Sequence, residues 1–177
     1  NSGFARANNM GLKLAKGAYA LLLNTDTIVL QKALEKCYFL MLENKNVVGA
    51  GIQLLNIDKS NQFSGSKFVN GGLNTLLPLP YLGNMIRKLG YKFKYKRPGI
   101  DSVNETVDVD WIVGAFIMIQ RHIIEKNELL DEDFFMYSEE IEWCNRLKKH
   151  GILKLYNEPK IYHLGGGSSK EFYNTTD

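Results

Sequence analysis

The apolar segment 19–23, followed at once by Asn-Thr-Asp-Thr at 24–27, restricts the fold more than any other stretch of the chain. Its apolar residues do not alternate with polar ones, which is typical of a strand buried on both faces of a parallel α/β sheet. Ligands bind at the carboxyl edge of such a sheet. We therefore expect Asp26 at the mouth of a crevice, with Asn24 on the same side, where a carboxylate can hold a hard divalent cation. The same residues also fit a turn and a cap for the next helix.

Composition indicates one globular domain. A length of 177 residues, 45% of them hydrophobic and 23% charged, is sufficient for a sizeable core. A net charge of +3 is too small to indicate nucleic-acid binding by itself. Cys37 and Cys144 lie on helical patterns among apolar neighbours, as reduced, buried thiols of a cytoplasmic protein would. No apolar run approaches the ~20 residues that span a bilayer.

The rest of the pattern predicts alternating helices and strands. In order, we expect a helix at 4–16, a helix at 30–43, a strand at 47–55, a strand region at 107–120, a helix after the N-cap Ser138 and a short strand at 152–156. Gly17 is the expected stop of the first helix. In the second helix the expected inward face consists of Leu34, Tyr38, Met41 and Leu42.

Between Lys59 and Gly99 the chain contains no Asp or Glu, and from Tyr91 onward basic residues alternate with aromatic ones. Such a segment fits contact with an anionic membrane surface or with an acceptor that carries a lipid diphosphate. It fits a solvated surface loop equally well. No nucleic-acid-binding motif accompanies it.

Three motifs at the start of the chain resemble the family 2 inverting glycosyltransferases, and in particular their rhamnosyltransferase-like branch. They are Asn-Ser-Gly-Phe-Ala-Arg-Ala-Asn-Asn-Met-Gly at 1–11, Ala-Lys-Gly at 15–17 and Leu-Leu-Asn-Thr-Asp at 22–26. The resemblance implies the GT-A fold, a Rossmann-related mixed and mainly parallel α/β sheet flanked by helices. In that family the last carboxylate of the Asp-x-Asp element binds Mg or Mn on the donor diphosphate, and Asp26 occupies this position. Asn24 stands where many relatives carry Asp, which implies weaker metal binding.

The same resemblance assigns residues to the two substrates. Arg6 is placed to pair with a donor phosphate in bidentate fashion, although it equally fits a solvated helix face. Asn9 lies near the nucleotide crevice as a contact or as a packing residue. Asp110, Trp111 and Gly114 match the stretch that lines the acceptor pocket, where the indole offers a flat face to a pyranose ring.

Acidic residues at 139–140 resemble the family's Glu-Asp motif, whose second carboxylate is the general base. By position the base is Glu140, although relatives usually carry Asp there, and Glu139 is the second candidate. Acidic residues at a helix N-terminus are also favoured by the helix dipole alone. His163 precedes a loop of three glycines and two serines, which is able to fold over phosphates. In related GT-A enzymes a His at this place completes the metal site or contacts the diphosphate.

We expect a single catalytic domain over 1–177, in which 1–58 form the donor and metal half, 59–106 a basic variable insertion, and 107–177 the acceptor and base half with a closing loop. The chain begins at Asn1 directly on a family motif. The family places the strands that hold the nucleotide before this point. We therefore expect an N-terminally truncated fragment that lacks the N-terminal nucleotide-binding strands.

Taken together, the resemblance implies a metal-dependent inverting glycosyltransferase of the hexosyltransferase type. It would move a sugar from a dTDP-, UDP- or GDP-linked donor to a glycan or polyprenyl-linked acceptor in bacterial surface polysaccharide synthesis, in the cytoplasm or on the inner face of the membrane. The alternative is a catalytically incompetent nucleotide- or sugar-binding fragment of the same fold. A nucleotidyltransferase on a similar scaffold would favour a glycine- and lysine-rich loop near its N-terminus, and no such loop is visible.

Overall fold

The computed structural model describes residues 3–68, 105–126, 128–134 and 138–165. In chain order its elements are α1 (Phe4–Leu14), β1 (Tyr19–Leu23), β2 (Thr27–Val29), α2 (Ala33–Glu43), β3 (Val47–Leu55), β4 (Asn61–Gln62), β5 (Gly65–Ser66), β6 (Val107–Val109), β7 (Trp111–Ile112), β8 (Phe116–Gln120), α4 (Arg121–Glu125), α5 (Glu139–Leu147) and β9 (Ile152–His163). Within these ranges a seven-stranded sheet has the order β1-β8-β3-β9-β2, with β4 beside β3 and β6 beside β9. A second, two-stranded sheet joins β5 to β7.

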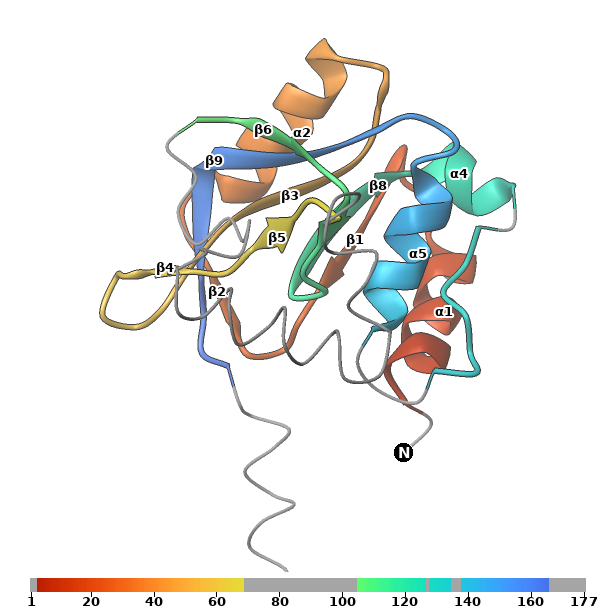
Figure 1. The fold of residues 1–177 in the computed structure, drawn as a ribbon, viewed down its shortest axis with the longest axis horizontal. Coiled ribbons are helices and arrows are strands. Elements are labelled where there is room, and N and C mark those ends of the chain that lie inside the picture. The colour runs from red at the N-terminus through yellow and green to blue at the C-terminus, as the bar shows by residue number, and fades with distance from the viewer. Residues whose placement is uncertain (1–2, 69–104, 127, 135–137, 166–177) are drawn as a thin grey trace, which may run out of the picture.

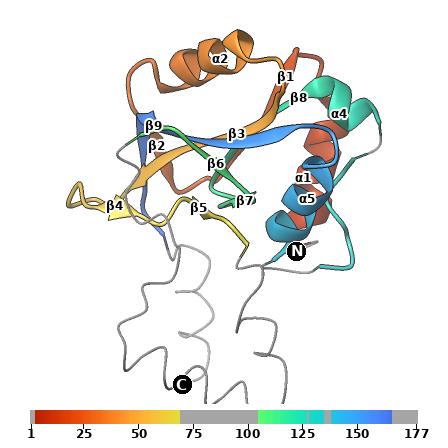
Figure 2. The ribbon, with the colours of Figure 1, turned by 45° about the horizontal axis from the view of Figure 1, so that its top comes forward.

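Helices cover both faces of the large sheet, α2 on one and α1, α4 and α5 on the other (Figures 1 and 2). Strand β8 shows why two cores form, because successive side chains of a strand point to opposite faces. Ile117 and Ile119 are buried in the core against α1, α4 and α5. Phe116 and Met118 are buried in the core against α2. The predicted mixed α/β sheet flanked by helices is confirmed.

The expectation of a mainly parallel sheet is wrong. Among the strand pairs that the structure describes, β3 and β9 are parallel. The pairs β1–β8, β3–β8, β2–β9, β3–β4 and β6–β9 are antiparallel. The reason is topological: β8 lies between β1 and β3 and runs opposite to both. β1 therefore lies at one end of the strand order and is not buried on both faces, with Leu23 37% exposed.

Two strand predictions differ from the structure in length. The region 107–120 is divided into β6, β7 and β8, because β7 leaves the large sheet to pair with β5. The strand predicted at 152–156 continues to His163. The register of β9 against β3 shifts at residues 157–159, since Ile52 pairs with Tyr156 and Gln53 pairs with Lys160. The strand predicted at 47–55 is confirmed as β3.

Helix boundaries follow the backbone conformation of the flanking residues. Helix α1 begins after Gly3, whose φ of 80° suits glycine, and it ends at Leu14 because Ala15 is extended, so Gly17 is not its stop. Helix α2 begins at Ala33 because Lys32 has a φ of 62°. Ser138 precedes α5, but its side chain makes no capping hydrogen bond.

The predicted inward face of α2 is mostly wrong. Ala33, Cys37 and Met41 are the residues that this helix buries against the sheet. Of the predicted face only Met41 is buried, whereas the exposed residues are Leu34 at 38%, Tyr38 at 37% and Leu42 at 42%. Cys37 and Cys144 are free, buried thiols as expected, and burial raises the pKa of each to about 12.

Most of the expected basic insertion, including 69–104, lies outside the described residues. The contact with a membrane surface or a lipid diphosphate that its alternating basic and aromatic residues suggest therefore stays a prediction. So does the glycine loop beyond Gly165. No helix in the described part of the chain is long and apolar enough to cross a bilayer.

Candidate active site

The loop that follows β1 lies beside the loop that precedes β8. Leu23 pairs with Phe116 at the end of β1, and the backbone N–H of Asn24 donates to the carbonyl of Ala115 over 3.1 Å. The backbone N–H of Val113 donates to the carbonyl of Ser64, which adds the segment between β4 and β5 to the same edge. The start of α5 and the end of β9 lie on this side as well, the lower side of the domain in Figure 1.

Asp26 and His163 meet at this edge. Antiparallel pairing of β2 with β9 sets Thr27 opposite His163, and the backbone N–H of Leu164 donates to the carbonyl of Asp26 over 2.8 Å. The Asp26 Oδ1 atom lies 3.3 Å from His163 Nε2, and the two side chains are 25% and 14% exposed. The structure therefore brings together the two residues for which the sequence predicted contact with a metal.

The Asp26 and His163 side chains fit a divalent cation that is also bound by a substrate. Two neighbouring ligands with bonds of ~2.1 Å lie about 3 Å apart in octahedral coordination, close to the separation of Oδ1 and Nε2. Among the described residues no group of three or more His, Cys, Asp or Glu side chains could hold a metal. Mg²⁺ and Mn²⁺ are often held by one or two protein ligands plus phosphate oxygens, so two ligands suffice when a diphosphate supplies the others. The imidazole favours Mn²⁺ over Mg²⁺.

Asn24 contributes to this edge through its backbone. Besides the bond to Ala115, its carbonyl accepts a hydrogen bond from the Thr27 hydroxyl over 2.7 Å. Both contacts fix the shape of the loop that carries Asp26. The donor-binding role predicted for the Asn24 side chain stays a prediction.

Glu139 and Glu140 begin α5 next to the loop before β8. A Cβ placed on Gly114 would lie 3.4 Å from Phe4 Cζ and 3.8 Å from Glu140 Cβ, which are ordinary van der Waals distances, so Gly114 is a direct neighbour of the base candidate. Burial, with the charge of Glu139 beside it, raises the pKa of Glu140. A carboxylate with a raised pKa is a better proton acceptor at neutral pH. Glu139 is 4% exposed, and within the described residues its Oε2 atom has no hydrogen-bond partner.

The three predicted acceptor residues have different surroundings. Trp111 is half-buried, and its ring packs against Phe63 with centroids 5.3 Å apart. Asp110 is already paired: one carboxylate oxygen contacts Lys148 Nζ, and the other accepts the Phe68 N–H over 2.6 Å. Sugar binding by Asp110 would therefore require these contacts to be exchanged. Gly114 stands beside Glu140, where a small residue leaves room.

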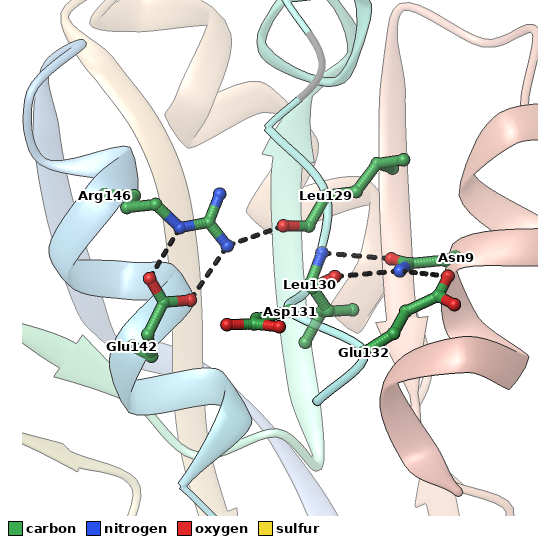
Figure 3. A pocket seen from close by; sticks show the side chains of 7 residues that line it. All are labelled: Asn9, Leu129, Leu130, Asp131, Glu132, Glu142 and Arg146. Carbon is green, nitrogen blue, oxygen red and sulfur yellow. Dashed lines mark hydrogen bonds and ion pairs between the residues drawn. The ribbon is translucent and has the colours of Figure 1, made fainter. Parts of the chain in front are cut away.

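Arg6 and Asn9 contact the segment 130–132. Asn9 is 2% exposed, its Nδ2 atom donates to the Leu130 carbonyl over 2.8 Å, and its Oδ1 atom accepts the Leu130 N–H over 3.0 Å. The Arg6 Nε atom lies 3.2 Å from Glu132 Oε2. The other Glu132 oxygen, Oε1, accepts a hydrogen bond from Asn9 Nδ2 over 3.0 Å (Figure 3). These contacts favour the packing interpretation of Asn9. The pocket in Figure 3 is lined by Asn9, Leu129, Leu130, Asp131, Glu132, Glu142 and Arg146, and it includes none of the residues of the Asp26 edge.

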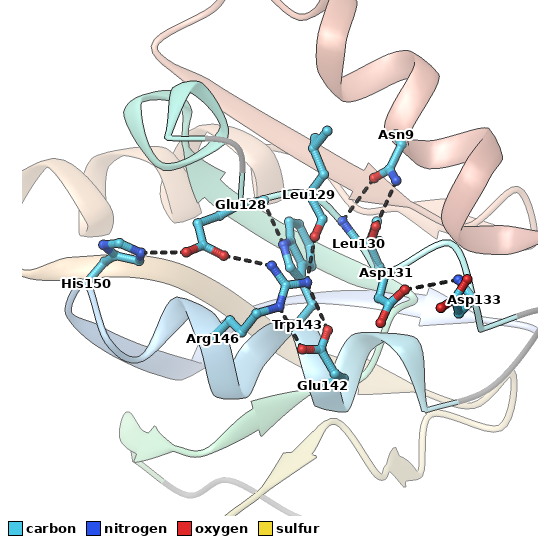
Figure 4. Close-up of polar contacts among 10 residues, drawn as sticks. All are labelled: Asn9, Glu128, Leu129, Leu130, Asp131, Asp133, Glu142, Trp143, Arg146 and His150. Atoms are coloured by element: carbon cyan, nitrogen blue, oxygen red, sulfur yellow. Dashed lines mark hydrogen bonds and ion pairs between the residues drawn. The ribbon is translucent and has the colours of Figure 1, made fainter.

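Sequence reasoning missed a charged network between α5 and the segment before it (Figure 4). Arg146 pairs with Glu142 over 2.6 Å and with Glu128 over 2.7 Å, and His150 Nε2 lies 3.0 Å from the other Glu128 oxygen. The Trp143 indole N–H donates to the Glu128 carbonyl over 2.9 Å. The hydrogen bond to His150 and the Arg146 pair lower the pKa of Glu128. The i,i+4 spacing of Glu142 and Arg146 was a usable signal.

The sequence model described as "Glycosyl transferase family 2" matches residues 1–125, which is more than half of the chain. The chain belongs to glycosyl transferase family 2. The match includes α1, the Asp26 loop and β8, and it ends before α5 and the end of β9, which carry Glu140 and His163.

Curated relatives of this family 2 chain include two that are named rhamnosyltransferases. It is 25% identical over 175 residues to "dTDP-rhamnosyl transferase RfbF" of Shigella flexneri, covering 96% of this chain and 51% of RfbF. It is 26% identical over 185 residues to "Rhamnosyltransferase WbbL" of Escherichia coli K12, covering 97% and 64%. "Low-salt glycan biosynthesis hexosyltransferase Agl10" of Haloferax volcanii is 26% identical over 160 residues, covering 86% and 45%. The chain thus spans about half to two thirds of the length of these relatives, and the resemblance to rhamnosyltransferases is confirmed.

A solved structure supports the fold of the family 2 chain. It is described as the crystal structure of GalNAc-T7 with UDP, GalNAc and Mn²⁺, and it matches with a TM-score of 0.59 over 92% of this chain and 30% of that one. The sequences are 15% identical, so the likeness concerns the fold alone. The fold is GT-A-like.

Proposed function

We propose that this chain carries the donor-metal and acceptor-base parts of an inverting glycosyltransferase that acts in surface-glycan synthesis. The donor is a nucleoside diphosphate sugar, with dTDP-rhamnose the first to test because a relative is named for dTDP-rhamnosyl transfer. The acceptor is a glycan or a polyprenyl-linked glycan at the cytoplasmic face of a membrane. The observation that carries the proposal is the meeting of Asp26 and His163 at the edge where Glu140 also lies.

Each side chain has a defined task in this proposal. The oxygen of the acceptor hydroxyl attacks the anomeric carbon from the face opposite the diphosphate, and Glu140 accepts the proton that this hydroxyl loses. The raised pKa of Glu140 suits that step. Gly114 leaves space for the acceptor beside this carboxylate. Trp111 offers an aromatic face for the sugar ring.

Asp26 and His163 would hold Mg²⁺ or Mn²⁺ with the donor. When bound, such a cation neutralises the negative charge of the diphosphate leaving group. The Asp26 loop is held to β8 by the bond from Asn24 to Ala115 and to β9 by the bond from Leu164. These backbone contacts keep the carboxylate in place before the donor arrives, which reduces the ordering cost of binding.

Calorimetric titration with dTDP-rhamnose and with UDP-sugars, with and without Mn²⁺, tests the proposal. We expect Mn²⁺-dependent donor binding by the wild-type chain, its loss in Asp26→Ala, and its retention in the control Asp58→Ala, which removes an exposed carboxylate from the turn after β3. Wild-type protein that binds no donor in the presence of Mn²⁺, or Asp26→Ala that binds as the wild type does, would contradict the metal role.

Product analysis with the same donors separates the enzyme from the catalytically incompetent alternative. Transfer to a glycan or polyprenyl-linked acceptor with inversion at the anomeric carbon supports the enzyme. Donor binding without transfer to any acceptor of either class would favour a nucleotide- or sugar-binding role and would overturn the catalytic part of the proposal.

A further inference from the structure

The Gln62 side chain lies between the turn after β3 and the end of β9, in contact with the imidazole ring of His163. Its Oε1 atom is 2.6 Å from His163 Nδ1. Its Nε2 atom donates to Asn56 Oδ1 over 3.0 Å and to the backbone carbonyl of His163 over 3.5 Å. His163 Nε2 faces Asp26. The two ring nitrogens of His163 thus have different neighbours, one an amide and the other a carboxylate.

The orientation of the Gln62 amide follows from its acceptors. A backbone carbonyl only accepts hydrogen bonds, so the amide end that faces the His163 carbonyl is the NH₂ group. The amide oxygen therefore faces Nδ1, and because this oxygen only accepts, Nδ1 carries the proton. In the neutral ring Nε2 then has the lone pair, directed toward Asp26.

The backbone of Gln62 is fixed independently of His163. Strand β4 pairs with β3 with Gln62 opposite Leu54. The Gln62 carbonyl accepts hydrogen bonds from the side-chain NH₂ of Gln53, which is 0% exposed, and from the Ser64 hydroxyl, each over 2.8 Å. The amide that contacts the ring is therefore anchored to the most buried strand of the sheet.

We propose that Gln62 is a positioning residue that holds His163 in the tautomer with the proton on Nδ1 and so presents the Nε2 lone pair to a divalent cation beside Asp26. The cation part rests on the proposed function. Ligating imidazoles generally donate their other N–H to a fixed acceptor, and loss of that acceptor weakens metal affinity by about 10–100-fold.

Nitrogen-15 NMR of the imidazole groups in the metal-free chain, followed as the pH is raised until the shifts no longer change, reads the tautomer of the neutral ring directly. We expect protonated Nδ1 and unprotonated Nε2 for His163, with His163→Ala used to assign the signals. In Gln62→Met, which keeps the length and removes the acceptor, we expect the Nε2–H form to appear. Gln62→Glu, which restores an acceptor oxygen, should return the Nδ1–H form.

Mn²⁺ titration followed by electron paramagnetic resonance, with dTDP present, gives the second readout. We expect about 10–100-fold weaker Mn²⁺ binding in Gln62→Met. The control is Asn61→Met, the same kind of change at the exposed neighbouring residue of β4, which should alter neither the tautomer nor the affinity.

The possible failures are distinguishable. An Nε2–H tautomer in the wild type, or a tautomer unchanged in Gln62→Met, overturns the role of Gln62 whatever the metal does. If the tautomer changes as expected but Mn²⁺ affinity is the same in the wild type, Gln62→Met and His163→Ala, the cation site of the proposed function is wrong. In that case Gln62 positions a ring that has another task.

Discussion

Two polar regions of this domain are each assembled from distant parts of the chain, yet they differ in how their groups are paired. In the cluster between α1 and α5, Asn9 uses both ends of its amide on the Leu130 backbone, and Arg146 is paired with two carboxylates. At the Asp26 edge, by contrast, the Glu139 Oε2 atom has no hydrogen-bond partner within the described residues. The Asp26 carboxylate has one contact there, with His163.

We infer that the difference reflects a structural role for the first region and, in line with the proposed function, a binding role for the second. A buried polar group that is fully paired stabilises the fold, whereas one that is left unpaired costs free energy unless a ligand completes it. The α1–α5 cluster therefore fixes the segment 128–132 against the helices. At the Asp26 edge, within the described residues, Glu139 Oε2 lacks a partner and the Asp26 side chain is 25% exposed, as the proposed binding role requires.

The largest expected effect concerns turnover. Glu140→Gln removes the proton acceptor and should lower kcat by about 10²–10⁴-fold with donor affinity unchanged. Glu142→Gln, two residues later on α5 but within the paired cluster, should leave kcat unchanged. Fixed-time assays at saturating donor concentration give kcat for both variants. Full turnover in Glu140→Gln would contradict the assignment of Glu140 as the base, and Glu139 would then be the first candidate.

The wild-type pH profile sharpens the same assignment. Because burial raises the pKa of Glu140, the base is protonated at a higher pH than an ordinary glutamate with a pKa of 4.5. The acid limb of kcat/KM, which reports ionisation in the free enzyme, should therefore lie above pH 4.5, and activity should be lost as the pH falls through the raised pKa. An acid limb at or below the ordinary value would contradict the assignment.

The next largest effect concerns stability. Asn9→Leu leaves the N–H and carbonyl of Leu130 without their partner in a buried position, so we expect a loss of about 2–4 kcal/mol. For a domain of this size that lowers Tm by roughly 4–16 °C in a thermal melt. Asp26→Asn should change Tm far less, since the Asp26 side chain is 25% exposed and is not part of the packed core. Equal effects on Tm would remove the distinction between the two regions.

A smaller, pH-dependent effect is expected for Arg146→Met. In the wild type the pKa of Glu128 is lowered, so the stability that this carboxylate contributes is present above its ordinary value of 4.5 and is lost as the pH falls through the lowered value. Without Arg146 the decline of Tm as the pH falls below 4.5 should be shallower, and stability at neutral pH should fall by about 1–2 kcal/mol. An unchanged slope would show that His150 alone sets the titration of Glu128.

The smallest effect is expected for Arg6→Ala. Its ion pair with Glu132 is solvent-exposed, so the loss should be under about 0.5 kcal/mol. Donor affinity, measured by calorimetry, should not change. A fall in donor affinity would instead assign Arg6 to the phosphate, in line with the alternative that the sequence left open.

Local patterns predicted most of the elements but not their neighbours in space. Strand β3 was predicted to the residue because nine residues that are apolar except for Gln53, with two glycines among them, favour a buried strand. The insertion of β8 between β1 and β3 depends on contacts between segments far apart in the chain, which no local pattern encodes. The expectation of a mainly parallel sheet failed for that reason.

Side-chain orientation was harder where apolar residues are abundant. Helix α2 carries apolar residues around most of its circumference, and the sheet selected the stripe with the small residues Ala33 and Cys37, which permits close packing. The expected larger stripe is exposed. Trp143 was likewise not predicted as a core residue, although it is 0% exposed, because its burial depends on the Glu128 carbonyl that accepts its N–H.

The candidate site was predicted in part by physics and in part by resemblance. The position of Asp26 after a strand followed from the polar residues that end the apolar run. The pairing of Asp26 with His163 could not follow from pattern alone, because it depends on the register of β2 against β9. The roles of Arg6 and Asn9 remained open for a similar reason, since their partner segment is far away in sequence.

Strand β9 has a consequence for how this chain tolerates length changes. Between Tyr156 and Lys160 it advances four residues while β3 advances one, so residues 157–159 lie at a register shift between the two strands. Because side chains alternate along a strand, a change in length that moved β9 by one residue against β2 would set Leu164 opposite Thr27 and turn the imidazole to the other face. A one-residue shift of this kind would separate His163 from Asp26 while every side chain of the candidate site remained in the sequence.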